Sequence, residues 1–126
     1  MNTSALPKDP ILKDDGLHAA NSLGSSGELE VMRITKAVRS KNGELRYHGQ
    51  PARAGSMARS IWVSFTTEGL PPSPEFDAET GTLHLYYPNR DHPEVQGLLN
   101  SKRNRFCYYW RSAQGDRTHA WLLSSR

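Results

Sequence analysis

Hydrophobic and polar residues alternate with a period of two along several stretches of this chain, a pattern typical of β-strands that bury one face. The clearest stretch is 60–67, where three apolar side chains share one face and Trp62 lies on the other. Residues 82–87 repeat the pattern, with Tyr86 on the more polar face. Each stretch predicts a strand, and each leaves an aromatic ring on the outer side of the sheet.

The stretch 29–39 fits two elements. Its apolar residues match a helical stripe, but its β-branched residues favour a strand. The dipeptide Asn42-Gly43 follows, and Asn-Gly is a strong signal for a two-residue turn between antiparallel strands. A hairpin with 44–48 as its second strand would pair Val38 with Tyr47. We therefore expect a strand at 29–39.

The segment 104–123 predicts a second hairpin, which turns near Gly115. Its residues divide into two faces, and the more apolar face is expected to be the core. Tyr109 then lies outside, between Arg105 and Arg111. The expected core face comprises Phe106, Tyr108, Trp110, His119, Trp121 and Leu123.

One helix is expected, at 91–102. Pro93 suits its first turn, and apolar residues recur on one side of it. The segment 49–59 is rich in Gly, Ala and Pro and predicts a mobile loop. Three prolines within 68–81 argue against a regular element there.

Domain organisation follows from composition. Residues 1–27 hold few apolar side chains and keep no period, so they predict a disordered N-terminal arm. Residues 28–126 form a single small β-rich domain.

The expected fold class is α+β and predominantly antiparallel β. About six short strands in the order β-β-β-β-α-β-β would form a bent sheet or a partly open barrel with one helix. A helix before the last two strands resembles the architecture of the five-stranded Greek-key barrel that binds oligonucleotides. This chain has one strand more than that barrel, and a shared architecture does not establish a shared function.

Composition adds limits to this picture. The chain has 126 residues, 36% of them hydrophobic, and a mean hydropathy of −0.71, so its core is modest and its surface polar. Cys107 is the only cysteine, which excludes an internal disulfide. No apolar run has the length of a signal peptide or a membrane span. We expect a soluble cytoplasmic protein that does not contact a membrane.

Charge is unevenly distributed. Residues 31–63 contain seven lysines and arginines and one acid, a balance of +6, and residues 101–126 contain six and one, a balance of +5. Residues 68–80 contain four acids and no base. Separate positive blocks suit a polyanionic partner, although a solvated basic surface has the same composition.

Motifs for catalysis and cofactors are absent. The five histidines show no i, i+4 pair and there is one cysteine, so no metal site is expected. The chain has no Gly-x-Ser-x-Gly turn and no phosphate-binding glycine loop. We expect neither enzymatic activity nor a cofactor.

The remaining candidate chemistry is a set of outward rings with arginines beside them. Rings on a sheet surface stack nucleobases, and arginines neutralise the phosphates of a single strand. A non-catalytic module that binds nucleic acid, preferably single-stranded, is therefore the leading hypothesis. Its candidate residues are Trp62, Tyr86, Tyr109, Arg46, Arg53, Arg59, Arg105 and Arg111.

A protein-interaction module, such as an adaptor, inhibitor or immunity-type protein, is the alternative. Exposed rings and arginines are also the residues that dominate protein interfaces. A homodimer is compatible with the pattern, because a strand at 118–124 could pair with a second copy at a sheet edge.

Overall fold

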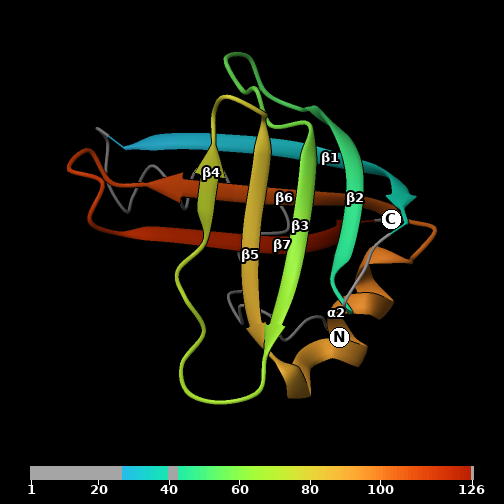
Figure 1. Ribbon diagram of the computed structural model, residues 1–126. Coiled ribbons are helices and arrows are strands. Elements are labelled where there is room, and N and C mark those ends of the chain that lie inside the picture. Colours follow the sequence, from blue (N-terminus) through green and yellow to red (C-terminus); the bar gives the residue numbers. More distant parts are fainter. Residues whose placement is uncertain (1–26, 40–42, 126) are drawn as a thin grey trace.

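The computed structural model of the chain describes residues 27–39 and 43–125, which form one seven-stranded sheet curved into a half-barrel (Figure 1). The strand order is β4-β5-β3-β2-β1-β6-β7, and all neighbours are antiparallel except the parallel pair β3–β5. The expected class, a mostly antiparallel partly open barrel with a short helix, is confirmed. The strands are β1 (Glu28–Val38), β2 (Leu45–Pro51), β3 (Ser60–Thr66), β4 (Glu75–Asp77), β5 (Thr82–Pro88), β6 (Asn104–Arg111) and β7 (Thr118–Ser125).

The sheet folds over itself into two layers. In Figure 1, β4, β5, β3 and β2 run across β1, β6 and β7, so the two parts of the sheet cross at a steep angle. Side chains from both layers fill the space between them, and Val95 and Leu99 of the helix close one end. The buried members of this core are Met32, Ile34, Tyr47, Ala58, Ile61, Val63, Leu83, Leu85, Val95, Leu99, Cys107, Tyr109 and Leu122.

The strand expected at 29–39 is present as β1, but the expected register of the first hairpin is wrong by one residue. Val38 pairs with Arg46, and Ala37 pairs with Tyr47. Register in a hairpin is fixed by its turn, and the pairs nearest the turn, from Lys36–His48 to Val38–Arg46, already have this register. The β-bulge between Ile34 and Lys36 shifts it by one further residue toward the start of β1. The proposed turn at 42–43 lies partly outside the described residues.

The last hairpin pairs as expected, but the expected core face is wrong. Cys107 and Tyr109 belong to the core between the two layers. Trp110 and Trp121 point from the opposite face of the same strands, where they form a second cluster with Leu29, Tyr108 and Leu123. Both faces of this sheet layer are apolar, so a comparison of hydrophobicity could not identify the inner one.

Three element boundaries also differ from expectation. β2 runs to Pro51 and so includes the first residues of the expected loop 49–59. The segment 68–81 contains the short edge strand β4, which begins directly after the last of the three prolines and pairs with β5. The expected helix 91–102 is shorter: a 3₁₀ turn at Asn89–Asp91 (η1) precedes α2 (His92–Leu99). The end of α2 is fixed from outside, because Arg105 donates to the Leu99 carbonyl and the Tyr47 hydroxyl donates to Asn100.

The expected disordered arm, residues 1–27, lies outside the described residues except for Gly27. Within the described ranges, no helix has the length and apolar character needed to cross a membrane.

Candidate nucleic-acid interface

The eight residues proposed from the sequence lie in separate parts of the fold. Arg46, Trp62 and Tyr86 come from adjacent strands and share the outer face of the layer formed by β2, β3 and β5. The remaining five are the core residue Tyr109, two arginines of β6, and two arginines of the loop between β2 and β3.

The register aligns the outer residues in rows across the sheet. Arg46 pairs with Trp62, and Trp62 pairs with His84. One row further along, Ser64 pairs with Tyr86. Rows that lie two residues apart are separated by about 6.7 Å along the strands. We call the set Arg46, Trp62, His84 and Tyr86 the ring face.

Trp62 is the centre of the ring face and contacts neighbours on both sides. The Arg46 guanidinium carbon lies 3.8 Å from the centre of the Trp62 ring, within the range of a cation–π contact. The His84 ring meets Trp62 edge-on, with centroids 5.3 Å apart and an interplanar angle of 74°. The exposed fractions of all three side chains are intermediate, so the cluster is ordered but reachable from solvent.

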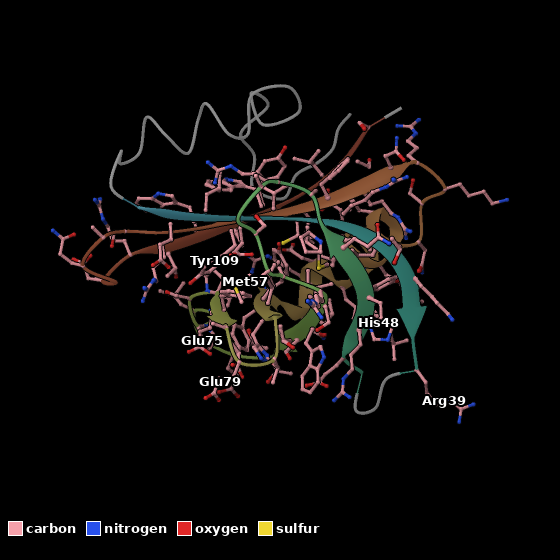
Figure 2. The ribbon with its side chains drawn as sticks, turned by 90° about the horizontal axis from the view of Figure 1, so that it is seen from above. Arg39, His48, Met57, Glu75, Glu79 and Tyr109 are labelled. Carbon is pink, nitrogen blue, oxygen red and sulfur yellow. The ribbon has the colours of Figure 1, made fainter. Side chains whose placement is uncertain are left out.

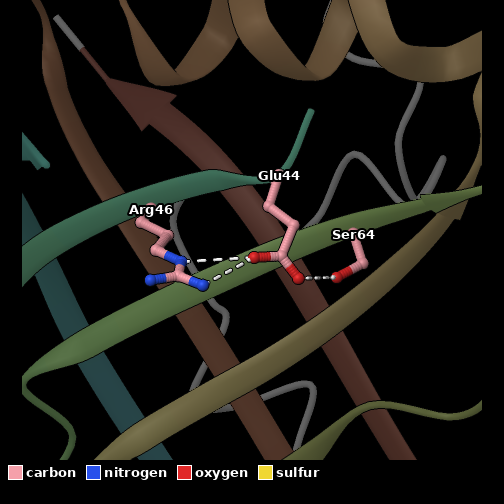
Figure 3. Close-up of polar contacts among 3 residues, drawn as sticks. All are labelled: Glu44, Arg46 and Ser64. Atoms are coloured by element: carbon pink, nitrogen blue, oxygen red, sulfur yellow. Dashed lines mark hydrogen bonds and ion pairs between the residues drawn. The ribbon is translucent and has the colours of Figure 1, made fainter. Parts of the chain in front are cut away.

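Glu44 holds Arg46 in position over the ring. One carboxylate oxygen of Glu44 accepts hydrogen bonds from Nε and Nη2 of Arg46, at 3.2 and 2.8 Å, and the other accepts one from Ser64 at 3.3 Å (Figure 3). The two charged side chains are about a quarter exposed, at 28% and 27%. Glu44 therefore orients the guanidinium but also neutralises its charge.

Tyr86 remains a neutral hydrogen-bond donor at ordinary pH. Burial raises its pKa, and the nearby carboxylates of Glu75 and Glu44 raise it further. The ring face thus combines one cation, one neutral phenol, an indole and an imidazole on three adjacent strands.

Tyr109 does not belong to this interface, and the expectation that it faces outward is wrong. Its exposed fraction is 4%, and its ring lies 6.1 Å from that of Phe76, which points inward from β4. Tyr109 and Cys107 share the inner face of β6, because residues two apart on a strand point the same way.

Arg105 is a structural residue rather than a free cation. Its guanidinium donates to the carbonyls of Leu99, Ile34 and Thr35, so it ties the end of α2 to β1. Arg111 forms an ion pair with Glu28 at 3.2 Å. Neither arginine flanks an outward ring.

The two loop arginines lie at the end of the half-barrel where β2 leads into β3. Arg53 makes a long contact of 3.5 Å to the Leu29 carbonyl, and the Arg59 backbone is bonded to Gly81. Both side chains are exposed. They stay candidates for phosphate contacts.

Sequence reasoning missed two members of this site. His84 has the same strand parity as Tyr86, so its outward position could have been inferred from the alternation in 82–87. Glu44 precedes Arg46 by two residues, which is the spacing of neighbours on one strand face. The ion pair could have been proposed from that spacing alone.

Metal ligation has no support in the described ranges, where no three His, Cys, Asp or Glu side chains are grouped as ligands. No known family model matches the chain, and no curated protein or solved structure is significantly similar to it.

Proposed function

We propose that the protein is a non-catalytic module that binds single-stranded nucleic acid on the ring face. The observation that carries the proposal is the row of Arg46, Trp62 and His84 across three adjacent strands, with Tyr86 in the next row. Unpaired bases stack on such rings for about 1–3 kcal/mol each, and arginine supplies the charge for the backbone.

The Glu44 carboxylate competes with a nucleic-acid phosphate for the Arg46 guanidinium. A phosphate that approaches Arg46 replaces the Glu44 carboxylate as its partner, and a base that stacks on Trp62 takes the place of the guanidinium over the ring. The loop arginines Arg53 and Arg59 are exposed and are further candidates for phosphate contacts. Binding of this kind depends on salt, because neutralised phosphates release counterions.

The first test is the affinity of fluorescent single-stranded oligonucleotides for the full chain between about 50 and 200 mM salt. Glu44→Gln should raise the affinity about threefold, because it frees Arg46 and removes a negative charge from the path of the phosphates. Trp62→Ala should lower it about tenfold through the loss of stacking.

Two matched variants serve as controls. Glu68→Gln makes the same change in net charge on an exposed loop, and His119→Ala removes a ring from the opposite side of the molecule. Both should leave the affinity unchanged. Affinity that does not vary with salt, or a Glu44→Gln variant that binds no better than Glu68→Gln, would contradict the proposal.

A protein partner on the same face is the second candidate. Glu44, Glu75 and Asp77 share the outer side with Arg46, so the surface carries both signs of charge, as protein interfaces do. This candidate gains if Trp62→Ala abolishes capture of a protein while oligonucleotide binding is undetectable at low salt. A cytoplasmic location fits both candidates and is part of the proposal.

A further inference from the structure

A cleft of about 960 Å³ opens at the end of the half-barrel, with His84 of the ring face on its rim and Arg46 outside it. Three segments form its walls: the loop between β2 and β3, strand β4, and the start of β1 with the adjoining turn of the β6–β7 hairpin. In Figure 2 the labels of Tyr109 and Met57 lie between β1 and β4 and that of Glu75 lies at β4 itself, and all three residues line this cleft.

The lining is acidic although the whole chain is basic. Four carboxylates and two guanidinium groups contribute to it, a balance of −2 against +3 for the chain. Most of these groups are already engaged. Glu28 pairs with Arg111, and Glu30 accepts the backbone N–H groups of Met57 and Ala58 at 2.7 and 2.9 Å. These contacts fix the walls.

Among the four carboxylates of the cleft, that of Glu75 has no bonding partner in the described residues. Within residues 27–39 and 43–125, its carboxylate makes no hydrogen bond and no ion pair, whereas the Asp77 carboxylate accepts the N–H of Glu79 at 3.0 Å. Glu75 lies on the edge strand β4, and its side chain is exposed. A single negative charge is therefore presented at the cleft wall with its hydrogen-bonding capacity unused.

Tyr109 supplies a second unused polar group. Its side chain is 96% buried and lines the cleft, yet its hydroxyl has no hydrogen-bond partner in the described part of the chain. Burial raises its pKa, Arg111 lowers it, and Glu28, Glu75 and Glu30 raise it, so charged cleft groups surround the hydroxyl. The fully buried polar atoms without a partner in the described residues lie elsewhere, so the Tyr109 hydroxyl is open to the cleft and a ligand there can bond to it.

The apolar part of the cleft completes the recognition surface. Phe76 contacts the Tyr109 ring, and Met57 is 53% exposed, an unusual state for a large apolar side chain. A ligand that satisfies this lining carries a cationic head on an aliphatic stem. Arginine and lysine side chains have that form, since they cover apolar surface with the stem and present the charge at its end.

We propose that this cleft binds an arginine or lysine side chain of a partner protein. The cationic head donates hydrogen bonds to the Glu75 carboxylate and to the Tyr109 hydroxyl oxygen, and the stem lies against Met57 and Phe76. The site adjoins the ring face at His84, which also lines the cleft, but its ligand has the opposite charge to a nucleic acid. It does not depend on the proposed function.

The test measures binding of a fluorescent peptide of glycine and arginine to the full chain. The comparison peptide carries citrulline in place of each arginine, which keeps the shape and removes the charge. The arginine peptide should bind at least about tenfold more tightly. Glu75→Gln should weaken it about tenfold and Tyr109→Phe about fivefold, since each removes one bond to the cation.

The controls distinguish a built site from general attraction. Glu79→Gln removes a nearby carboxylate that does not line the cleft and should change nothing. Tyr109→Phe keeps the ring in the core, so its thermal midpoint should stay within a few degrees of that of the parent. Trp62→Ala should leave peptide binding intact even if it abolishes oligonucleotide binding.

Three outcomes would overturn the proposal. One is equal binding of the citrulline peptide, and another is an equal loss in Glu75→Gln and Glu79→Gln. The third is displacement of the arginine peptide by spermidine at the concentration of the peptide itself, which would make the cleft a site for free polyamines.

Discussion

Single side chains in this molecule take their roles from partners that are distant in the sequence. Arg105 and Arg46 have the same chemistry, but one is bound to backbone carbonyls inside the fold and the other lies over an outward ring. Tyr109 and Tyr86 differ in the same way. Residue type predicts what a side chain can bond to, and the strand face that it occupies decides which bonds it makes.

Arg105 provides a direct test at this scale. Replacing it by methionine keeps the stem but removes the bonds to the carbonyls of Leu99, Ile34 and Thr35. The free energy of unfolding should fall by about 2–3 kcal/mol, because hydrogen bonds from a charged donor are lost together. Urea denaturation measures the change. Arg103→Met, at an exposed position before β6, should stay within about 0.5 kcal/mol of the parent.

At the scale of elements, the β-bulge in β1 decides which residues of the first hairpin face the core. Gly49 lies opposite Ile34 at the position where the register shifts. A Cβ atom there would lie 2.4 Å from the Arg33 carbonyl oxygen and 2.8 Å from the Met32 side chain. The strand can approach β1 this closely only because residue 49 has no side chain.

Gly49→Ala should therefore destabilise the protein by about 2 kcal/mol or more, since the added methyl group meets backbone. Gly97→Ala is the matched control. Its Cβ would meet nothing within 4 Å on the exposed side of α2, so the same substitution should stabilise the protein by about 0.5–1 kcal/mol. Thermal unfolding of both variants measures the difference, and equal shifts of the same sign would refute this account of the bulge.

The elements also show how far the sequence could be interpreted. The alternation of apolar and polar residues was sufficient to predict β3, β5 and the strands of the last hairpin, because it runs through each of them without interruption. The β-bulge in β1 and the short edge strand β4 produce no comparable alternation of apolar residues in the sequence. The inner face of the last hairpin was chosen wrongly because Trp110 and Trp121 make the outer face as apolar as the inner one.

The candidate site was predictable to a similar extent. Alternation placed Trp62 and Tyr86 outward, and their strands proved adjacent. Arg105 and Tyr109 could not be assigned from sequence, because their partners come from β1, α2 and β4. The cleft was not predictable at all, since its walls come from segments that only the folded sheet brings together.

At the scale of the whole molecule, the fold disfavours ionisation of its tyrosines. The pKa of each of the five is raised, with burial as the main cause. The charged form is the phenolate, so the folded protein holds these protons more tightly than the unfolded chain does. Stability is unaffected below about pH 10 and falls as the pH rises above that value.

Alkaline titration should therefore show tyrosinate absorbance that appears together with unfolding rather than ahead of it. Tyr87 has the largest rise in pKa, and Tyr87→Phe removes that proton release while keeping the ring. The variant should begin to unfold at a higher pH than the parent, as measured by circular dichroism. Tyrosine ionisation that is complete before any loss of structure would contradict this expectation.

The pairing of β1 with β6 has a consequence for how the chain is made. It joins residues up to 83 positions apart, Glu28 and Arg111, and it attaches the last hairpin to the rest of the sheet. Contacts this distant in sequence bear a large loop-closure entropy and slow the folding of β-rich domains. During synthesis, β1 to β5 leave the ribosome before β6, so one edge of β1 stays unpaired until the last hairpin emerges. The domain is thus expected to fold after translation of β6 and β7, and nascent chains that stop before them should require chaperones.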